Sequence, residues 1–134
     1  CLFSTLGMIR GSENRRRAVA QARRILKPGG RFVLHVHNFW YNLRDPGGPW
    51  WVFKSLLRSV VVRDYEPGDK FFDYRQIPNM YLHVFRRREV CSLLQRAGFR
   101  VVEMIRLDPQ RFRALRRPWF FGNLRANGWI VVCE

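Results

Sequence analysis

Two histidines, His35 and His37, stand two positions apart in the apolar segment 31–37. Because alternate side chains of a strand point to the same face, both imidazoles would share one face of a strand. Adding His83 would complete a set of three nitrogen ligands for a metal ion. The alternative is a pair of partly buried strand histidines without a ligand. His37 lies nearest the end of the strand, where an imidazole that titrates near neutral pH could act as a general base.

Polar and aromatic residues follow this strand directly. Asn38 could share the polar lining of a ligand pocket with the histidine before it. The aromatic residues that come next could form a lid over an apolar or aromatic ligand, or pack as a local core. Tyr81 and His83 would share one face of a later strand and could line the same cavity. The aromatic residues in question are Phe39, Trp40, Tyr41, Trp50 and Trp51.

Arginine is abundant, and the formal net charge is +15. The densest basic clusters are residues 86–88 and 111–117, and aromatic side chains lie within and after the second. Phosphate pairing and base stacking on such a surface could bind RNA. Only three of the 25 basic residues are lysines. Because the basic residues are spread along the whole chain, a solvated surface of an arginine-rich protein is the favoured interpretation.

Periodicity and turn signals predict the elements that would position these residues. With Ser12 as its N-cap, a first helix runs to Leu26 and ends at the turn 27–30. A second helix covers residues 87–97 and ends at Gly98. Residues 50–62 fit either a short helix or an extended segment. Strands are expected at 1–9 (running into a loop), 31–37, 70–76, 80–85, 99–105 and 129–133, with 77–79 as a turn and 108–125 irregular.

This alternation of strands and helices indicates an α/β sheet with parallel crossovers, and the last two strands are expected to pair antiparallel. The order resembles the second half of a class I S-adenosylmethionine-dependent methyltransferase. The resemblance is carried by residues 3–9, by the R-x-LKPGG turn within 13–34, and by the AGF sequence that ends 85–99. The fold class it implies is a partial Rossmann-like methyltransferase sheet (strands four to seven, the last antiparallel) with flanking helices.

The same resemblance implies a cofactor, an acceptor and site residues. S-adenosyl-L-methionine would be the cofactor and a small molecule the methyl acceptor, with no metal ion. The alternatives are a basic module that binds RNA or another nucleic acid, and a tRNA-directed methyltransferase. Ser4, Thr5 and Leu6, in the loop after the fourth strand, would contact the methionine part of the cofactor. His37 would be the base. The residues expected to bind the acceptor are Asn38, Trp40, Tyr41, Tyr81 and His83.

Two family features have no counterpart in this sequence: the glycine-rich loop after the first strand and the acidic residue that holds the cofactor's ribose. We therefore expect residues 1–134 to be the C-terminal part of a methyltransferase domain, with 38–85 as a substrate-side insert and an N-terminal half before Cys1. The chain alone would be inactive and would not bind the cofactor with useful affinity. Residues 1–9 would be a bare apolar edge strand, which favours self-association.

Composition excludes several other classes of protein. Hydrophobic residues make up 47% of the chain, which argues against disorder. No apolar run reaches the ~18 residues that a membrane span needs, so no membrane partner is expected. Cys1, Cys91 and Cys133 are widely spaced and form no CxxC or zinc pattern, which indicates a reduced, cytoplasmic setting.

Overall fold

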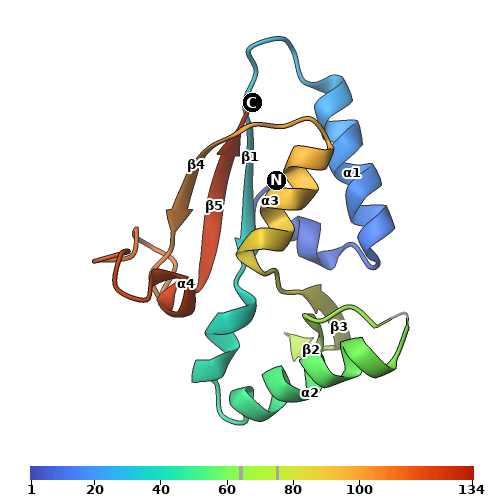
Figure 1. Cartoon of the computed structure of the whole chain (residues 1–134), viewed down its shortest axis with the longest axis vertical. Helices are drawn as coiled ribbons and strands as arrows, with labels where there is room; N and C mark the ends of the chain where they lie inside the picture. Colours follow the sequence, from blue (N-terminus) through green and yellow to red (C-terminus); the bar gives the residue numbers. More distant parts are fainter. Residues whose placement is uncertain (64, 75) are drawn as a thin grey trace.

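A computed structural model of the chain describes residues 1–63, 65–74 and 76–134. A three-stranded sheet carries two helices on one face, and a second helix–hairpin layer lies below it (Figure 1). The elements in chain order are η1 (Thr5–Met8), α1 (Ser12–Ile25), β1 (Phe32–His37), η2 (Phe39–Arg44), α2 (Gly48–Val61), β2 (Asp69–Tyr74), β3 (Ile77–His83), α3 (Arg87–Arg96), β4 (Val101–Arg106), α4 (Gly122–Arg125) and β5 (Gly128–Cys133).

The main sheet has the order β1–β5–β4, and β5 runs antiparallel to both neighbours. Leu34 faces Val131 across one ladder, and Ile105 faces Ile130 across the other. The expected antiparallel pairing of the last two strands is therefore confirmed. Because β5 is antiparallel to both, β1 and β4 are parallel to each other, as an α/β crossover requires.

The first helix follows its sequence pattern. α1 buries Val19 against the sheet, and Leu26 caps it just before the expected turn, in which Gly29 takes φ 74°. The N-cap is Gly11, so the assignment of Ser12 as N-cap is wrong by one residue. The backbone N–H of Ser12 instead donates to the Glu66 carboxylate at 2.6 Å. A long-range partner thus replaces the local cap that the side chain could have provided.

The expected strand at residues 1–9 is wrong, because only Cys1 hydrogen-bonds along β1. The Cys1 N–H donates to Val33 O at 2.8 Å, and the His35 N–H donates to Cys1 O at 2.9 Å. The chain then leaves the sheet, because Phe3 and Ser4 both take left-handed φ values, 55° and 59°. The 3-10 turn η1 follows. Among the described residues, the main sheet therefore has β1 and β4 as its edge strands, and Cys1 covers part of β1.

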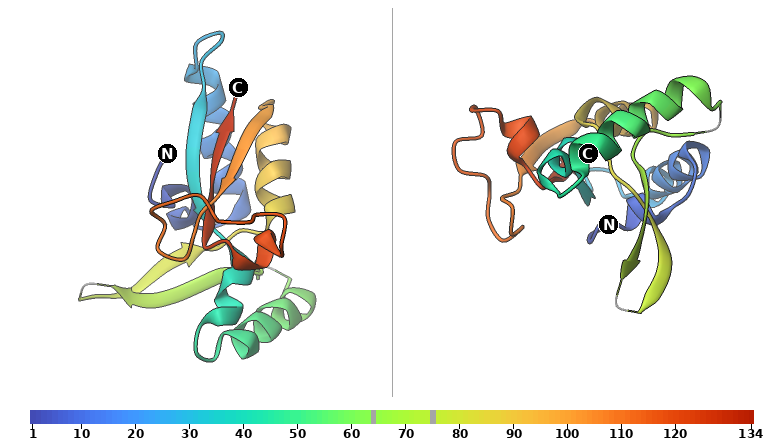
Figure 2. Two further views of the ribbon diagram at one scale, coloured as in Figure 1. Left: turned by 90° about the vertical axis from the view of Figure 1, so that its left-hand side faces the viewer. Right: turned by 90° about the horizontal axis from the view of Figure 1, so that it is seen from below.

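The middle of the chain forms a helix and a hairpin. Of the two alternatives for residues 50–62, the structure has the helix, which Pro49 begins in its first turn. The two predicted strands are present and pair antiparallel, with Phe71 facing Tyr81. However, Ile77 pairs with Tyr74, so residues 77–79 belong to β3 and the expected turn there is wrong. Figure 2 shows the hairpin projecting beyond the sheet.

The C-terminal part agrees with its sequence pattern in outline. α3 ends before Gly98, which takes φ 81°, and β4 follows. The stretch expected to be irregular contains one short helix, α4, directly before β5.

Two apolar clusters hold the layers together. The larger lies between the sheet and the helices α1 and α3 and includes Leu34, Val36, Val90, Leu94 and Trp129. The smaller joins η2, α2 and the end of the hairpin around Phe39, Val52 and Val84. Among the described residues, no helix has the length and apolar character that crossing a membrane requires.

Gly7 marks the closest approach between η1 and the hairpin. A Cβ at this position would lie 2.5 Å from the backbone oxygen of His83. We expect Gly7→Ala to lower the free energy of unfolding by about 1–3 kcal/mol, because backbone must move to relieve the overlap. Gly29→Asn is the control, since Gly29 has open space around it and asparagine tolerates its left-handed φ. Urea unfolding checks both variants, and equal stability of the two would contradict the expectation.

Candidate functional site

The face of the sheet opposite α1 and α3 borders a cavity of about 700 Å3. Alternation along β1 explains this: Leu34 and Val36 enter the core, so His35 and His37 face the other way. The hairpin and the loop after β4 form the remaining walls. Most of the lining is apolar and includes Leu2, Phe3, Met8, Phe72, Met80 and Leu82.

A second cavity of about 320 Å3 adjoins the first and is more polar, because Asn42, Asp45 and Lys70 line it. The two cavities share four lining residues, so we treat them as one cleft. It has a wide apolar end and a narrow polar end. The shared residues are His37, Phe72, Leu82 and Arg111.

His37 lies where the two ends of the cleft meet. Its Nδ1 is 3.3 Å from the side-chain oxygen of Asn127, and its ring lies edge-on to His35 at 5.0 Å between centroids. Burial, followed by the nearby His35 and Arg111 charges, lowers the pKa of His37 to about 4. The imidazole is therefore neutral at pH 7 and has a free lone pair. The role of His37 as a base stays a prediction.

His35 is 9% exposed and also borders the cleft. Its Nε2 is buried and has no hydrogen-bond partner among the described residues. Burial and the Arg111 charge lower the pKa of His35. A buried polar atom without a partner carries a free-energy cost unless a ligand satisfies it.

Asn38 borders the narrow end but has a structural role. Both hydrogens of its amide are donated to backbone oxygens, of Asn123 and Ala126, each at 2.7 Å. Its side-chain oxygen accepts the Trp40 N–H at 3.1 Å and caps η2. Asn38 therefore ties the end of β1 to the loop before β5 and shapes the cleft wall.

The aromatic residues after β1 have three different environments. Tyr41 borders the narrow end of the cleft. Trp40 and Trp51 pack against the smaller apolar cluster, which is the local-core alternative. Trp50 points outward, stacked on Phe53 and 59% exposed.

Tyr81 and His83 do not line the two cavities described above. They belong to a buried polar network between α1, the hairpin and α3. His83 is 1% exposed; its Nδ1 is 2.8 Å from Asp69, and its Nε2 is 2.7 Å from Glu89. Tyr81 donates its hydroxyl to Asp69 at 2.6 Å. Burial and this hydrogen bond raise the pKa of Tyr81 to about 12.

Arg15 completes the network. It is 1% exposed, pairs with Glu66, and donates to the Tyr81 hydroxyl at 3.2 Å and to Ile9 O at 3.0 Å. Sequence reasoning missed this residue because it stands in an arginine run. One signal could have found it: Arg15 precedes Val19 by four positions and so lies on the apolar face of α1.

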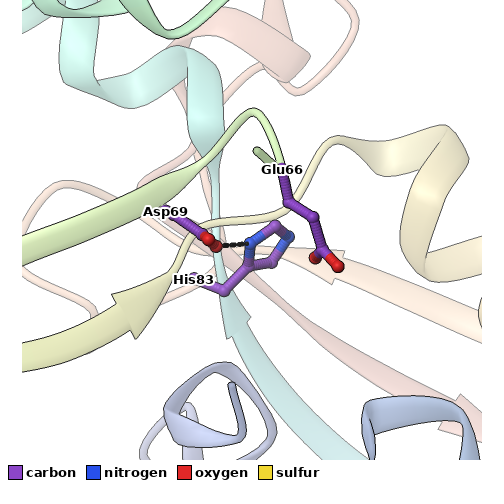
Figure 3. Close-up of side chains that lie close together, drawn as sticks. All are labelled: Glu66, Asp69 and His83. Carbon is purple, nitrogen blue, oxygen red and sulfur yellow. Dashed lines mark hydrogen bonds and ion pairs between the residues drawn. The ribbon is translucent and has the colours of Figure 1, made fainter. Parts of the chain in front are cut away.

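Glu66, Asp69 and His83 place ligand-type atoms within 4.8 Å of one another (Figure 3). Burial alone would lower the pKa of His83, but its hydrogen bonds to Asp69 and Glu89 raise it overall. Both ring nitrogens already face carboxylates, Asp69 and Glu89, and Arg15 adds positive charge beside the ring, which disfavours a metal ion there. The chemistry of this group is that of an ion-pair network. His83 thus lies apart from the two cleft histidines with which it could have formed a metal site.

Ser4, Thr5 and Leu6 face away from the cleft. The Ser4 hydroxyl is buried without a partner among the described residues, the Thr5 hydroxyl donates to Leu2 O at 2.6 Å, and Leu6 is in the main core. Their neighbours Phe3 and Met8 are the ones that reach the cleft. Ser4 is 0% exposed, so its unpaired hydroxyl is not accessible from the cleft in this structure.

The basic and aromatic clusters lie at the surface. Phe112, Trp119, Phe120 and Phe121 are 51–87% exposed. Arg125 holds their loop by donating to Phe120 O at 3.1 Å. Whether this surface binds RNA stays a prediction from the sequence.

The two kinds of histidine environment should be separable by titration. Histidine NMR signals should show His37 titrating near pH 4 and His83 above its ordinary 6.5. In the unfolded chain His37 takes up its proton near 6.5, so its contribution to stability falls as pH drops from about 6.5 to 4. His83 acts with the opposite sign: its contribution is complete below 6.5 and is lost as pH rises through its raised pKa. Reversed midpoints would contradict the structure.

Comparison with known proteins gives likeness in structure alone. No protein-family model matches the chain, and no curated protein matches its sequence. Among solved structures, it is similar to a SAM-dependent methyltransferase from Methanosarcina mazei (14% identity, TM-score 0.70), covering 99% of this chain and 56% of the other. It is also similar to the CcbJ methyltransferase from Streptomyces caelestis (16%, TM-score 0.59, 99% and 58%).

A third similar structure is the glycopeptide N-methyltransferase MtfA complexed with S-adenosyl-L-methionine (16% identity, TM-score 0.55, covering 99% of this chain and 51% of that one). The chain therefore spans about half the length of the solved proteins that it matches. At these identities the likeness establishes the fold, and the α/β class expected from the sequence is confirmed.

Proposed function

Because the chain has the fold of class I SAM-dependent methyltransferases, we propose that the protein takes part in methyl transfer from S-adenosyl-L-methionine to a small molecule. The observation that carries this proposal is the cleft at the carboxyl end of β1, with a neutral His37 at the junction of its two ends. In open α/β sheets, ligands bind beyond the carboxyl ends of the strands. The acceptor would lie in this cleft.

The cofactor supplies an activated methyl group on a sulfonium centre. Residues 4–6 would lie beside its methionine part; of the three, Thr5 is exposed, whereas Ser4 and Leu6 are buried. Phe3 and Met8 reach the cleft from either side of this segment. This arrangement supports a cofactor position next to the apolar end of the cleft.

The chain itself would contribute positioning and proton transfer. The apolar wall holds the acceptor in position, which lowers the entropic part of the activation barrier, and it keeps water away from the reacting atoms. When an acceptor oxygen or nitrogen bonds to the methyl group, it must lose its proton. His37 would accept that proton on its free ring nitrogen.

Cofactor binding by the chain alone is a separate question. The matched proteins are almost twice as long, and the sequence has neither a glycine-rich loop nor a ribose-binding acidic residue of the family type. We propose that the 134-residue chain does not bind S-adenosyl-L-methionine with micromolar affinity and is inactive alone. Calorimetry tests this, and micromolar binding would overturn it. The free thiols of Cys1, Cys91 and Cys133 support a reducing, cytoplasmic setting for the reaction.

Transfer of a labelled methyl group tests the main proposal. Because the chain alone is proposed to be inactive, the complete protein that contains it is incubated with methyl-labelled S-adenosyl-L-methionine and a metabolite extract, and the products are separated into small molecules, RNA and protein. Label in a small molecule is expected. Label in RNA would favour the alternative acceptor, which the exposed Arg111–Arg117 surface with Phe112 supports. Absence of label in every fraction would contradict methyl transfer.

A further inference from the structure

We propose that the cleft binds an apolar molecule carrying one carboxylate, and that Arg111 binds this carboxylate. The inference deepens the proposed function and rests on it in one respect, since the bound acid would be the methyl acceptor. Four observations carry it: the presentation of Arg111, its lack of a partner, an unsatisfied histidine nitrogen, and the apolar wall.

A rigid turn presents Arg111 to the cleft. The Arg111 N–H donates to the backbone oxygen of Asp108 at 3.1 Å, and the Asp108 carboxylate accepts the N–H of Phe112 at 3.0 Å and of Arg113 at 3.3 Å. Arg111 itself takes φ 66°, a conformation that residues other than glycine rarely adopt. Such strained residues cluster at ligand-binding positions, where the surrounding structure holds them. Arg111 borders both ends of the cleft.

Among the described residues, the guanidinium of Arg111 has no partner. No described residue forms a hydrogen bond or an ion pair with it, whereas Arg15 pairs with Glu66 and Arg16 with Glu13. Asp45, the carboxylate among the described residues of the cleft wall, is 3.5 Å from Lys70 Nζ. Lys70 also donates to Asn42 at 2.7 Å. Arg111 is therefore the cation of the described cleft lining whose charge has no partner.

His35 offers a second polar contact. His35 lines the cleft, and its Nε2 is buried without a hydrogen-bond partner among the described residues. In the tautomer with hydrogen on Nε2, this nitrogen becomes a donor for a bound oxygen once the ring turns toward the cleft. A guanidinium and one imidazole N–H suit the two oxygens of a carboxylate.

The remaining wall selects the body of the ligand. Leu2, Met8, Met80 and Leu82 with the ring of Phe72 form an apolar surface around about 700 Å3, which suits one or two fused rings. A single unpaired cation matches a monoanion, so a carboxylate fits better than a doubly charged phosphate ester. The ligand class is therefore a monocarboxylic acid with an apolar ring system.

Binding of 2-naphthoate and its neutral isostere 2-naphthamide tests the inference. Both are titrated at pH 7 into the wild-type protein and into Arg111→Gln, without cofactor. We expect 2-naphthoate to bind the wild type about three- to fivefold more tightly than 2-naphthamide, the most that a charge pair with an exposed side chain contributes. Arg111→Gln should lose this difference and keep its affinity for 2-naphthamide. Arg113→Gln is the matched control from the same exposed turn and should bind like wild type.

Three results would overturn the inference: equal binding of the two probes by wild type, an unchanged preference in Arg111→Gln, or no binding of either probe. Thermal unfolding of each variant shows that any loss of binding is not a loss of fold. Because the assay contains no cofactor, it is independent of methyl transfer. Arg111-dependent binding in a protein that transfers no methyl group would leave the carboxylate site in place and remove the proposed function.

Discussion

Arg15→Met is expected to lower the free energy of unfolding by about 3–5 kcal/mol, the largest stability effect anticipated for a single change in this chain. Methionine retains much of the buried aliphatic bulk but removes the charge and all five N–H donors. The Glu66 carboxylate, the Tyr81 hydroxyl and the Ile9 carbonyl would each lose a hydrogen-bond partner in or near the interior. Urea unfolding at pH 7 measures the loss.

Arg17→Met is the matched control. Arg17 lies on the same helix and also pairs with a carboxylate, Glu13 at 3.2 Å, but its side chain is 73% exposed. An exposed pair contributes at most about 1 kcal/mol, so this variant should remain near wild type. The double variant Arg15→Met/Glu66→Leu should recover much of the lost stability, because it removes the unpaired charge as well. Equal losses in Arg15→Met and Arg17→Met would show that the buried pair has no special role.

Replacing His37 with glutamine is expected to lower the rate of methyl transfer about 100- to 10,000-fold, the range for loss of a general base. Glutamine can keep a hydrogen bond to Asn127 but cannot accept the acceptor's proton. The measurement is kcat with a saturating acceptor in the protein shown to transfer methyl groups. KM should change little, because His37 acts on the reacting atom rather than on the body of the ligand.

The pH profile separates a base from a residue that only shapes the cleft. Wild-type activity should fall as pH drops through the lowered pKa of His37, about 4, because the protonated imidazole cannot accept a second proton. His37→Gln should lack this acidic limb. An unaltered profile in the variant, even with a lower rate, would leave His37 a structural role alone.

Elements with strong local signals could be predicted from sequence. α1 and α3 have apolar periodicity and end near Pro28 and Gly98, and the strands around Leu34 and Val131 are short apolar runs, so the limits of these elements depend on neighbouring residues. The prediction of a strand at residues 1–9 was wrong because their apolar pattern is equally compatible with a buried turn. Two left-handed residues, Phe3 and Ser4, direct the chain out of the sheet there. The prediction of a turn at residues 77–79 was wrong because a proline at the start of a strand gives the same sequence signal as a turn.

The candidate site was predicted only in part. His37 was predicted to lie at the cleft because it ends an apolar strand, and this position can be read from the sequence. Arg111, Phe72 and Met80 could not be found, because each comes from a different loop or strand and they meet only when the hairpin closes over the sheet. His83 was assigned to the acceptor by strand alternation. The structure places it against Asp69 and Glu89, which alternation along a single strand cannot reveal.

By itself, the sequence determined the order of elements, the sheet face on which His35 and His37 lie and the apolar strips that form the core. These follow from residue type and period along one segment. Tertiary structure decided which arginine is buried and which faces the cleft, since Arg15 and Arg111 stand in similar basic runs. The reason is physical: the state of a charge depends on the dielectric and the partners around it, and both come from distant parts of the chain.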